Sequence, residues 1–323
     1  MTVKETKDLI IIGAGPAGLT AGIYAARAGL DTLLIEKGLR GGTAGTIDLV
    51  ENYPGFPQGI SGMELMRKFE EQTKKFGVKF ANEEVVSINK VGEDKFVKTT
   101  ANEYLSHSII IATGTEHKKL EVPGEERLTG KGVSYCAVCD GPLYREKDIV
   151  VVGCGNSGIQ EGLFLLKLAR HITFVKFLEY MTAEKILQER IRKQPNASFL
   201  FGHKVTSING EDGVTGITVE NRKTGKSKVI KTQGVFVYVG IKPNTAWLRG
   251  ILDLAPNGYI ITNELLETSV PGIFAAGDVR NKGLRFFQIV SSASDGAFAT
   301  FSAEKYIEKN IINMNTDDTN FTN

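Results

Sequence analysis

The sequence has no hydrophobic run of about 18 residues, so a membrane-spanning helix is not expected. Its opening, MTVKETKDLI, has no apolar segment ending in small residues, so no secretory signal peptide is predicted. Only 3 cysteines occur, too few for a disulfide-stabilised secreted scaffold. A net charge of +2 gives no sign of a nucleic-acid partner. These absences predict a cytoplasmic protein, with cysteines that are reduced or catalytic and with no membrane or nucleic-acid partner.

The length and the glycine content point to an ordinary globular protein with ligand-binding loops. A chain of 323 residues is longer than one hydrophobic core usually serves, so two domains are expected. The composition, 41% hydrophobic and 24% charged, is typical of globular proteins. The 36 glycines suggest backbone that lies close to a ligand.

The first part of the chain has the pattern of a dinucleotide-binding βαβ unit. A β-branched run at residues 9–12 precedes a Gly-x-Gly-x-x-Gly turn, an alanine-rich helical stretch to about Gly29 and a strand at 32–35. Such a turn brings a pyrophosphate to the N-terminus of the helix, and an acid after the second strand accepts from ribose hydroxyls. The candidate residues are Gly13, Gly15, Gly18 and Glu36.

The same pattern returns in the second half. A strand at 149–152 precedes another Gly-x-Gly-x-x-Gly turn, a helix to about Ala169 and a strand at 171–175. Two such units predict an α/β protein with two Rossmann-like domains. The second unit lacks the acid, because Lys176 ends its strand and Glu179 comes three residues late. It has the fold expected of a nicotinamide-binding domain without the usual ribose contact.

The remaining segments are less regular. A long excursion at about 40–80 is followed by a β-rich stretch at 83–111, and short strands and hairpins are expected at 199–240. A last helix is predicted to begin at Ser291.

Two short segments, 113–118 and 242–246, are expected to connect the domains. One domain would then be discontinuous, comprising residues 1–117 and 243–323, and the other would comprise 118–242. The inserted domain holds 20 lysines and arginines against 13 acidic residues, a net charge of +7. This charge has two interpretations: an ordinary solvated surface, or a surface that attracts an acidic partner.

A single Cys-x-x-Cys motif, Cys136 to Cys139, carries the most specific chemistry. A tetrahedral zinc site would need two more ligands, which Cys154 and the four scattered histidines do not supply, so no metal is expected. The spacing suits a reversible disulfide. Asp140 either exchanges a proton with the dithiol or only forms the turn before Gly-Pro. Cys154, inside the glycine turn, is predicted to be an inert packed thiol.

Together these motifs resemble those of the low-molecular-weight, bacterial-type thioredoxin reductases, over about residues 7–309. The resemblance implies a split FAD domain (1–117 and 243–323) that holds the nucleotide-type domain (118–242) as an insertion. The matching segments are GAGPAGL, ENYPGFP (51–57), IATGTEHKKLEVPGE (111–125), CAVCDG (136–141), VVVGCGNSG (150–158) and TSVPGIFAAGDV (268–279).

The resemblance also implies roles for individual residues. Cys139 would face the flavin, Cys136 would attack the thioredoxin disulfide, and Asp140 would be the acid-base group. A homodimer and a large rotation between the domains are implied as well. The implied FAD-binding residues are Gly13, Gly15, Gly18, Glu36, Gly42, Asn52, Val86, Gly114, Asp278 and Gln288.

One departure from the family concerns the electron donor. NADPH-using members carry H-R-R-x-x-x-R for the 2′-phosphate, whereas Lys176, Phe177, Leu178 and Thr182 stand at these positions. Hydrogen bonds to charged groups contribute about 1.5–3 kcal/mol each, so losing three arginines should cost at least about a hundredfold in NADPH affinity. The family's R-Q pair before the last helix is also changed, to Phe287–Gln288. NADPH is therefore an unlikely donor, and NADH lacks its usual acid.

This pattern resembles the ferredoxin-dependent flavin thioredoxin reductases, which keep FAD and the dithiol but not the nucleotide. The preferred interpretation is thus a thioredoxin reductase with ferredoxin as donor. The alternatives are an NAD(P)H-dependent thioredoxin reductase with atypical specificity, a dithiol enzyme with another acceptor, and a non-enzymatic FAD-bound scaffold.

Overall fold

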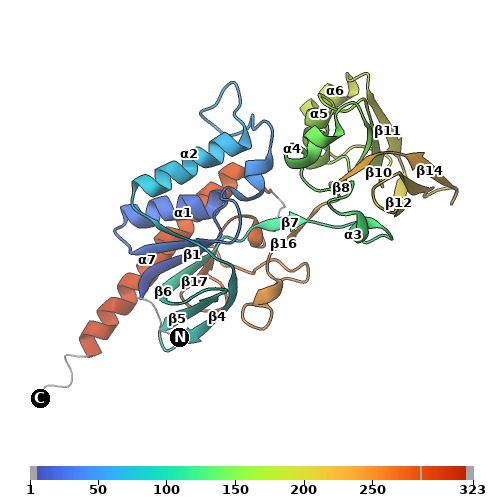
Figure 1. The fold of residues 1–323 in the computed structure, drawn as a ribbon. Coiled ribbons are helices and arrows are strands. Elements are labelled where there is room, and N and C mark those ends of the chain that lie inside the picture. The colour runs from blue at the N-terminus through green and yellow to red at the C-terminus, as the bar shows by residue number, and fades with distance from the viewer. Residues whose placement is uncertain (1–5, 284–285, 318–323) are drawn as a thin grey trace, which may run out of the picture. The chain divides into compact units, whose positions relative to one another are not determined.

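The structure, a computed structural model, describes residues 6–283 and 286–317, with side chains up to residue 310. The chain forms two compact units (Figure 1). Unit 1 consists of Met1–Gly45, Leu49–Glu116 and Lys242–Asn323, and unit 2 of Thr46–Asp48 and His117–Ile241.

Unit 1 contains a seven-stranded sheet in the order β3-β2-β1-β6-β5-β4, with β17 paired to β6. The strands β3, β2, β1, β6 and β17 pair in parallel, and β4, β5 and β6 form an antiparallel meander. The strands are β1 (Lys7–Ile12), β2 (Thr32–Glu36), β3 (Lys79–Asn82), β4 (Val85–Val91), β5 (Asp94–Thr99), β6 (Glu103–Ile111) and β17 (Ile273–Ala275).

Helix α2 (Gly62–Lys75) lies in the excursion for which no helix was predicted. The Ser61 hydroxyl accepts a hydrogen bond from Glu64 N at 3.2 Å and caps this helix, and the Ser-x-x-Glu sequence has the spacing of a capping box. The other helical elements of unit 1 are α1 (Pro16–Arg27), α7 (Ile289–Asp317) and the short turns η1 (Gly42–Thr46), η3 (Ala246–Leu248) and η4 (Gly277–Val279).

Helices α1 and α7 pack closely against each other. A Cβ on Gly296 would lie 2.1 Å from the Ala17 carbonyl oxygen, and Thr300 Oγ1 donates to Ala21 O at 3.1 Å. Helix α7 begins two residues before the predicted Ser291. This contact holds the start of α7 beside the first turn of α1.

Unit 2 contains a parallel five-stranded sheet, β11-β10-β9-β15-β8, and an antiparallel sheet, β12-β13-β14. A separate two-stranded sheet pairs β16 with β7, and each of these two strands has residues assigned to both units. The strands are β7 (Thr115–His117), β8 (Val133–Ser134), β9 (Asp148–Val152), β10 (His171–Lys176), β11 (Ala197–Phe201), β12 (His203–Asn209), β13 (Gly216–Asn221), β14 (Ser227–Lys231), β15 (Gly234–Val237) and β16 (Ile241–Pro243).

Helix α5 (Asn156–Leu165) ends four residues before the predicted Ala169. The Asn196 side-chain amide donates to Leu166 O at 3.2 Å and to Ala169 O at 3.3 Å, so these carbonyls are satisfied without further helix. The other helical elements of unit 2 are α3 (Glu125–Leu128), α4 (Ala137–Asp140), α6 (Lys185–Arg192) and the turn η2 (Gly141–Tyr144).

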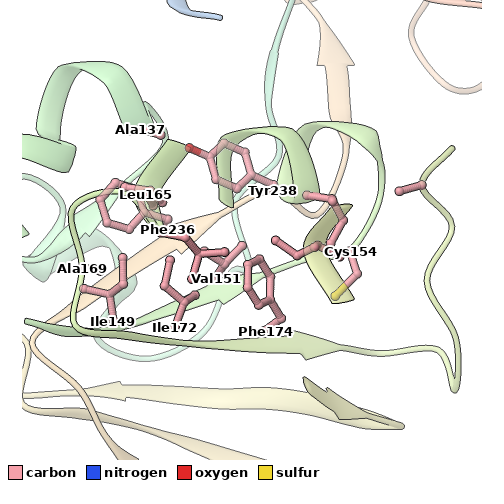
Figure 2. Packing of buried hydrophobic residues seen from close by; sticks show 14 of the residues in the cluster. Ala137, Ile149, Val151, Cys154, Leu165, Ala169, Ile172, Phe174, Phe236 and Tyr238 are labelled. Atoms are coloured by element: carbon pink, nitrogen blue, oxygen red, sulfur yellow. The ribbon is translucent and has the colours of Figure 1, made fainter. Parts of the chain in front are cut away.

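The core of unit 2 packs α4 and α5 over the parallel sheet (Figure 2). Gly162 of α5 approaches the Phe174 ring so closely that an added Cβ would lie 2.4 Å from it. Figure 2 shows the Tyr238 hydroxyl pointing toward Ala137 of α4. Within residues 6–283 and 286–317, no helix is long and apolar enough to cross a membrane. The same residues contain no group of three His, Cys, Asp or Glu that could hold a metal.

Candidate functional site

The first glycine turn closes the end of β1 against β6. Gly13 has φ +106°, and a Cβ there would lie 2.4 Å from Ala112 O. A Cβ on Gly18 would lie 1.8 Å from Gly13 O, so α1 needs glycine to pack on the turn. Gly15, the N-cap of α1, has open space, since no atom of the described residues lies within 4 Å of an added Cβ. The turn therefore leaves a gap at the N-terminus of α1.

Gly42 and Glu36 lie at this gap. A Cβ on Gly42 (φ +55°) would lie 3.4 Å from Gly15 Cα. The Glu36 carboxylate, at the end of β2, accepts from Ala14 N and from Gly38 N, each at 2.8 Å. These bonds fix the acid beside the glycine turn, where sequence analysis expects a ribose contact.

The other predicted FAD residues come from distant parts of unit 1. Gly114 (φ +59°) follows β6, whose end contacts Gly13, and it has open space around it. Asn52 and Gln288 meet directly, since Asn52 Nδ2 donates to Gln288 Oε1 at 3.0 Å. Asp278, in η4, accepts from Ser292 Oγ at 3.0 Å. The structure thus joins segments that are more than 200 residues apart in the chain.

Val86 lies in β4, the strand that follows β3 in the chain. Glu83 N donates to Glu36 O at 3.0 Å, so the start of β4 lies beside the end of β2. Val86 lies at the irregularity in the β4–β5 pairing, between Val85 and Ser87, with an exposed side chain. Its role in binding FAD stays a prediction.

In unit 2, Cys136 and Cys139 form a disulfide with a Cα–Cα distance of 5.4 Å. Cys136 caps the short helix α4, where its Sγ accepts from Cys139 N at 3.2 Å. Cys139 is exposed and Cys136 is half-buried. Leu143, in the turn η2 that follows α4, is an apolar side chain with 68% exposure, four residues after Cys139.

Ser134 links the disulfide to Asp140. Its hydroxyl donates to Asp140 Oδ2 at 2.6 Å and accepts from Cys136 N at 3.1 Å. The Ser134 side chain is buried, whereas the Asp140 side chain is partly accessible. Ser134 was not among the predicted site residues, although it stands two residues before Cys136 in the sequence. The arrangement holds a carboxylate next to the dithiol, where it can exchange protons.

Two buried titratable groups lie in the turn and in α5. Burial raises the pKa of the Cys154 thiol to about 12, which agrees with the prediction of an inert packed thiol. Burial also raises the pKa of the Glu161 carboxyl to about 8, and its Oε2 has no hydrogen-bond partner among the described residues. Burial therefore favours the protonated form of Glu161 at neutral pH.

The second glycine turn has the same backbone as the first. Gly153 (φ +119°) would place a Cβ 2.1 Å from Tyr238 O, and a Cβ on Gly155 would meet only Thr182 Oγ1, at 3.6 Å. Lys176, at the end of β10, donates to Thr182 Oγ1 at 3.1 Å. A lysine and a threonine therefore lie where a nucleotide-binding domain would place ribose contacts.

An arginine missed by sequence analysis also lies at the end of β10. The Arg222 guanidinium, from the β13–β14 turn, stacks 3.7 Å from the centroid of Phe177 and donates to Phe177 O at 3.2 Å. Beside it Lys223 pairs with Glu179 at 3.1 Å. The motif arginines are absent from their sequence positions, but a different arginine reaches the same end of the strand.

Comparisons with known proteins agree with this geometry. A family model for pyridine nucleotide-disulphide oxidoreductases matches residues 7–296. Thioredoxin reductase of Bacillus subtilis (strain 168) is 44% identical over 310 residues, which cover 96% of this chain and 97% of the relative. The chain belongs to the low-molecular-weight, bacterial-type thioredoxin reductase family.

Two further similarities also extend over nearly the whole chain. The crystal structure of Lactococcus lactis thioredoxin reductase has a TM-score of 0.91 and 38% identity, covering 94% of this chain and 99% of that one. A protein of Clostridium pasteurianum, described as a 34.2 kDa protein in the rubredoxin operon, is 44% identical over 310 residues. That match covers 94% of this chain and 99% of the relative.

The residues of unit 1 fit the FAD that is expected of thioredoxin reductases. Gly15 and Gly114 leave open space where added side chains would stand, and α1 offers its N-terminal amides at that space. Glu36 and Asp278 supply carboxylates for hydroxyl groups. We expect the pyrophosphate at Gly15 and the hydroxyl contacts at the two acids, while each individual role remains a prediction.

Proposed function

We propose that this protein reduces the disulfide of thioredoxin, moving electrons from FAD through the Cys136–Cys139 pair, with reduced ferredoxin as the donor. The observation that carries the thiol reaction is the accessible Cys136–Cys139 disulfide in a nucleotide-type domain. The choice of donor rests on the residues at the end of β10.

The thiol step is an exchange in two attacks. The Cys136 thiolate attacks one sulfur of the thioredoxin disulfide, which forms a mixed disulfide and releases one thioredoxin thiolate. The Cys139 thiolate then attacks Cys136 Sγ, which releases the second thioredoxin thiolate and re-forms the Cys136–Cys139 disulfide. Two electrons leave the dithiol, and two protons complete the reduced thioredoxin. The exposed Leu143 supports docking of thioredoxin beside the pair.

Asp140 is proposed to handle the protons. Ser134 fixes its carboxylate at 2.6 Å and also holds Cys136 N, so acid and sulfur are positioned by one hydroxyl. A proton that leaves a cysteine thiol can pass to this carboxylate, and the carboxyl can return a proton to a leaving thiolate.

Ferredoxin as donor agrees with the energetics. A ferredoxin near about −400 mV and a thioredoxin near about −270 mV differ by roughly 130 mV, or roughly 6 kcal/mol for two electrons. Because ferredoxin delivers electrons singly and a disulfide takes two, bound FAD would supply the centre that accumulates the pair. The net charge of +7 on residues 118–242 favours an acidic donor.

The donor can be tested directly on the FAD-loaded protein under anaerobic conditions. NADPH, NADH and reduced ferredoxin are added separately, and the visible flavin band is followed. We expect bleaching by ferredoxin and recovery when oxidised thioredoxin is added. Rapid bleaching by micromolar NADPH or NADH would contradict the ferredoxin donor but leave the thiol reaction intact. Cys136→Ser and Cys139→Ser should abolish this recovery. If the protein were instead a non-enzymatic FAD-bound scaffold, the same variants would still bind their partner.

A second candidate, an NAD(P)H-dependent thioredoxin reductase, is favoured by Arg222. This arginine and Lys176 place two cations at the end of β10, where a 2′-phosphate could meet them. The Arg222→Ala variant separates the two readings. It should raise the NADPH concentration needed for flavin reduction if the second candidate is right, and it should leave ferredoxin-linked reduction nearly unchanged if the first is right.

We also propose a homodimer, as the family resemblance implies. Phe298 and Phe301 of α7 are 41% and 53% exposed and stack at 6.5 Å, which gives the helix an apolar surface patch. Sedimentation of the wild type and of a Phe301→Ser variant tests whether a second copy covers this patch.

A further inference from the structure

A cluster of two carboxylates and two cations lies beside η4, at the start of α7. The Asp295 carboxylate accepts hydrogen bonds from Arg280 Nε at 2.9 Å and Arg280 Nη2 at 3.0 Å. It also accepts one from Gly277 N at 3.1 Å. Lys282 Nζ lies 3.1 Å from Asp295 Oδ2 and 3.6 Å from Asp278 Oδ1. The Lys282 side chain is only 9% exposed, so it is held between the two acids. One lysine thus bridges both carboxylates.

The two carboxylates differ in their support. Burial alone would raise the pKa of Asp295, but hydrogen bonds from Arg280 and the charge of Lys282 bring it below its ordinary value. Burial raises the pKa of Asp278 above its ordinary value, and Lys282 opposes that shift. Asp295 would keep Arg280 if Lys282 were neutralised. Among the described residues, Asp278 would then keep only the Ser292 hydroxyl.

The contacts of Asp278 with the described residues also leave one oxygen available. Ser292 Oγ and Lys282 Nζ both approach Oδ1, so Oδ2 can receive a hydroxyl donor. The neighbouring Gly277 has φ +79° and packs against α1, with its added Cβ 2.9 Å from Ala17 Cβ. Asp278 is therefore held next to the helix whose N-terminus faces the expected pyrophosphate.

We propose that Lys282 is a positioning residue for FAD, which holds Asp278 as a charged acceptor for a hydroxyl of the cofactor. This inference rests on the FAD site of the proposed function but on neither thioredoxin nor ferredoxin. A charged carboxylate accepts a stronger hydrogen bond than a neutral carboxyl. Lys282 acts through Asp278, and Arg280 independently secures Asp295.

The test compares Lys282→Met with Lys305→Met, an exposed lysine on α7 that pairs with Glu308. The FAD dissociation constant is measured from the flavin fluorescence released on dilution of the full-length holoprotein, between pH 5.5 and 8.5. We expect Lys282→Met to weaken FAD binding about tenfold near pH 6, about 1.4 kcal/mol. The loss should shrink toward pH 8.5, because rising pH ionises Asp278 without help. Lys305→Met should match the wild type.

A double-mutant cycle with Asp278→Asn separates this role from a structural one. With no carboxylate at 278, Lys282→Met should cause no further loss. A loss that persists in the Asp278→Asn background, or one that is equal at every pH, would place the action of Lys282 at Asp295 or in the fold and overturn the proposal. An unchanged affinity would overturn it too. If Lys282→Met does not fold, Lys282→Gln removes the charge while it keeps donors, and the same cycle applies. A wild type that retains no FAD would refute both this inference and the cofactor assignment.

Discussion

Replacing Ser134 by alanine tests whether the hydroxyl that joins Cys136 and Asp140 supports both stability and reactivity. Ser134 is 4% exposed, so in the alanine variant water cannot readily replace the hydrogen bonds that its hydroxyl makes with Asp140 Oδ2 and Cys136 N. A hydrogen bond to a charged group contributes about 1.5–3 kcal/mol, and we expect a destabilisation in this range. At roughly 2–4 °C per kcal/mol, the melting transition should fall by about 3–12 °C. The matched control, Ser227→Ala on the exposed strand β14, should change stability by less than about 0.5 kcal/mol.

The same Ser134→Ala variant should slow the proton-dependent exchange with thioredoxin. Without the 2.6 Å bond, the Asp140 carboxylate is free to turn away from the dithiol. Misplacement by about 1 Å can cost up to about a hundredfold in rate, so a tenfold fall in thioredoxin reduction is expected. The assay follows thioredoxin-dependent reoxidation of the prereduced protein in a single turnover. A normal melting transition together with a normal exchange rate would refute the role given to Ser134.

Three further results are expected. Gly15→Ala should fold normally, because no atom of the described residues lies within 4 Å of the added methyl group. The same variant should weaken FAD binding at least about tenfold. The control, Gly155→Ala in the second glycine turn, should keep ferredoxin-linked activity within about twofold of the wild type. A maleimide at pH 8 should label the two thiols of the reduced dithiol but not Cys154, whose pKa burial raises to about 12, until denaturant is added; mass spectrometry counts the labels. Burial raises the pKa of Glu161 from 4.5 to about 8, so the folded protein retains a proton that the unfolded chain releases between these values. Stability should therefore fall as pH rises from about 5 to 8, by at most about 1.4 kcal/mol per pH unit, and denaturant titrations of Glu161→Gln should show a flatter dependence.

The elements that sequence analysis predicted are those set by local patterns. The β-branched runs before both glycine turns became β1 and β9, because a buried parallel strand reads as a continuous apolar run. Helix α2 was missed although Ser61 and Glu64 gave a capping signal, since its apolar positions are few within a charged stretch. Ser134 and Arg222 owe their positions to tertiary contacts. No spacing rule connects Arg222 to Phe177, because α6 and the strands β11, β12 and β13 lie between them in the chain.

The glycines of the second turn show why a motif does not name its ligand. Gly153 and Gly158 are required by packing alone, because added Cβ atoms would lie 2.1 Å from Tyr238 O and 2.2 Å from Gly153 O. They would persist in a protein that binds no nucleotide. Only Gly155 has room for a methyl group. It is therefore the one glycine of this turn that packing does not require and that a bound ligand would require. Thr182 faces this glycine, and Lys176 donates to Thr182; both stand at positions of the family's NADPH motif where this sequence differs. Evidence about the donor therefore lies in the residues across from Gly155, and the Gly-x-Gly-x-x-Gly pattern by itself reports only how α5 packs on β9.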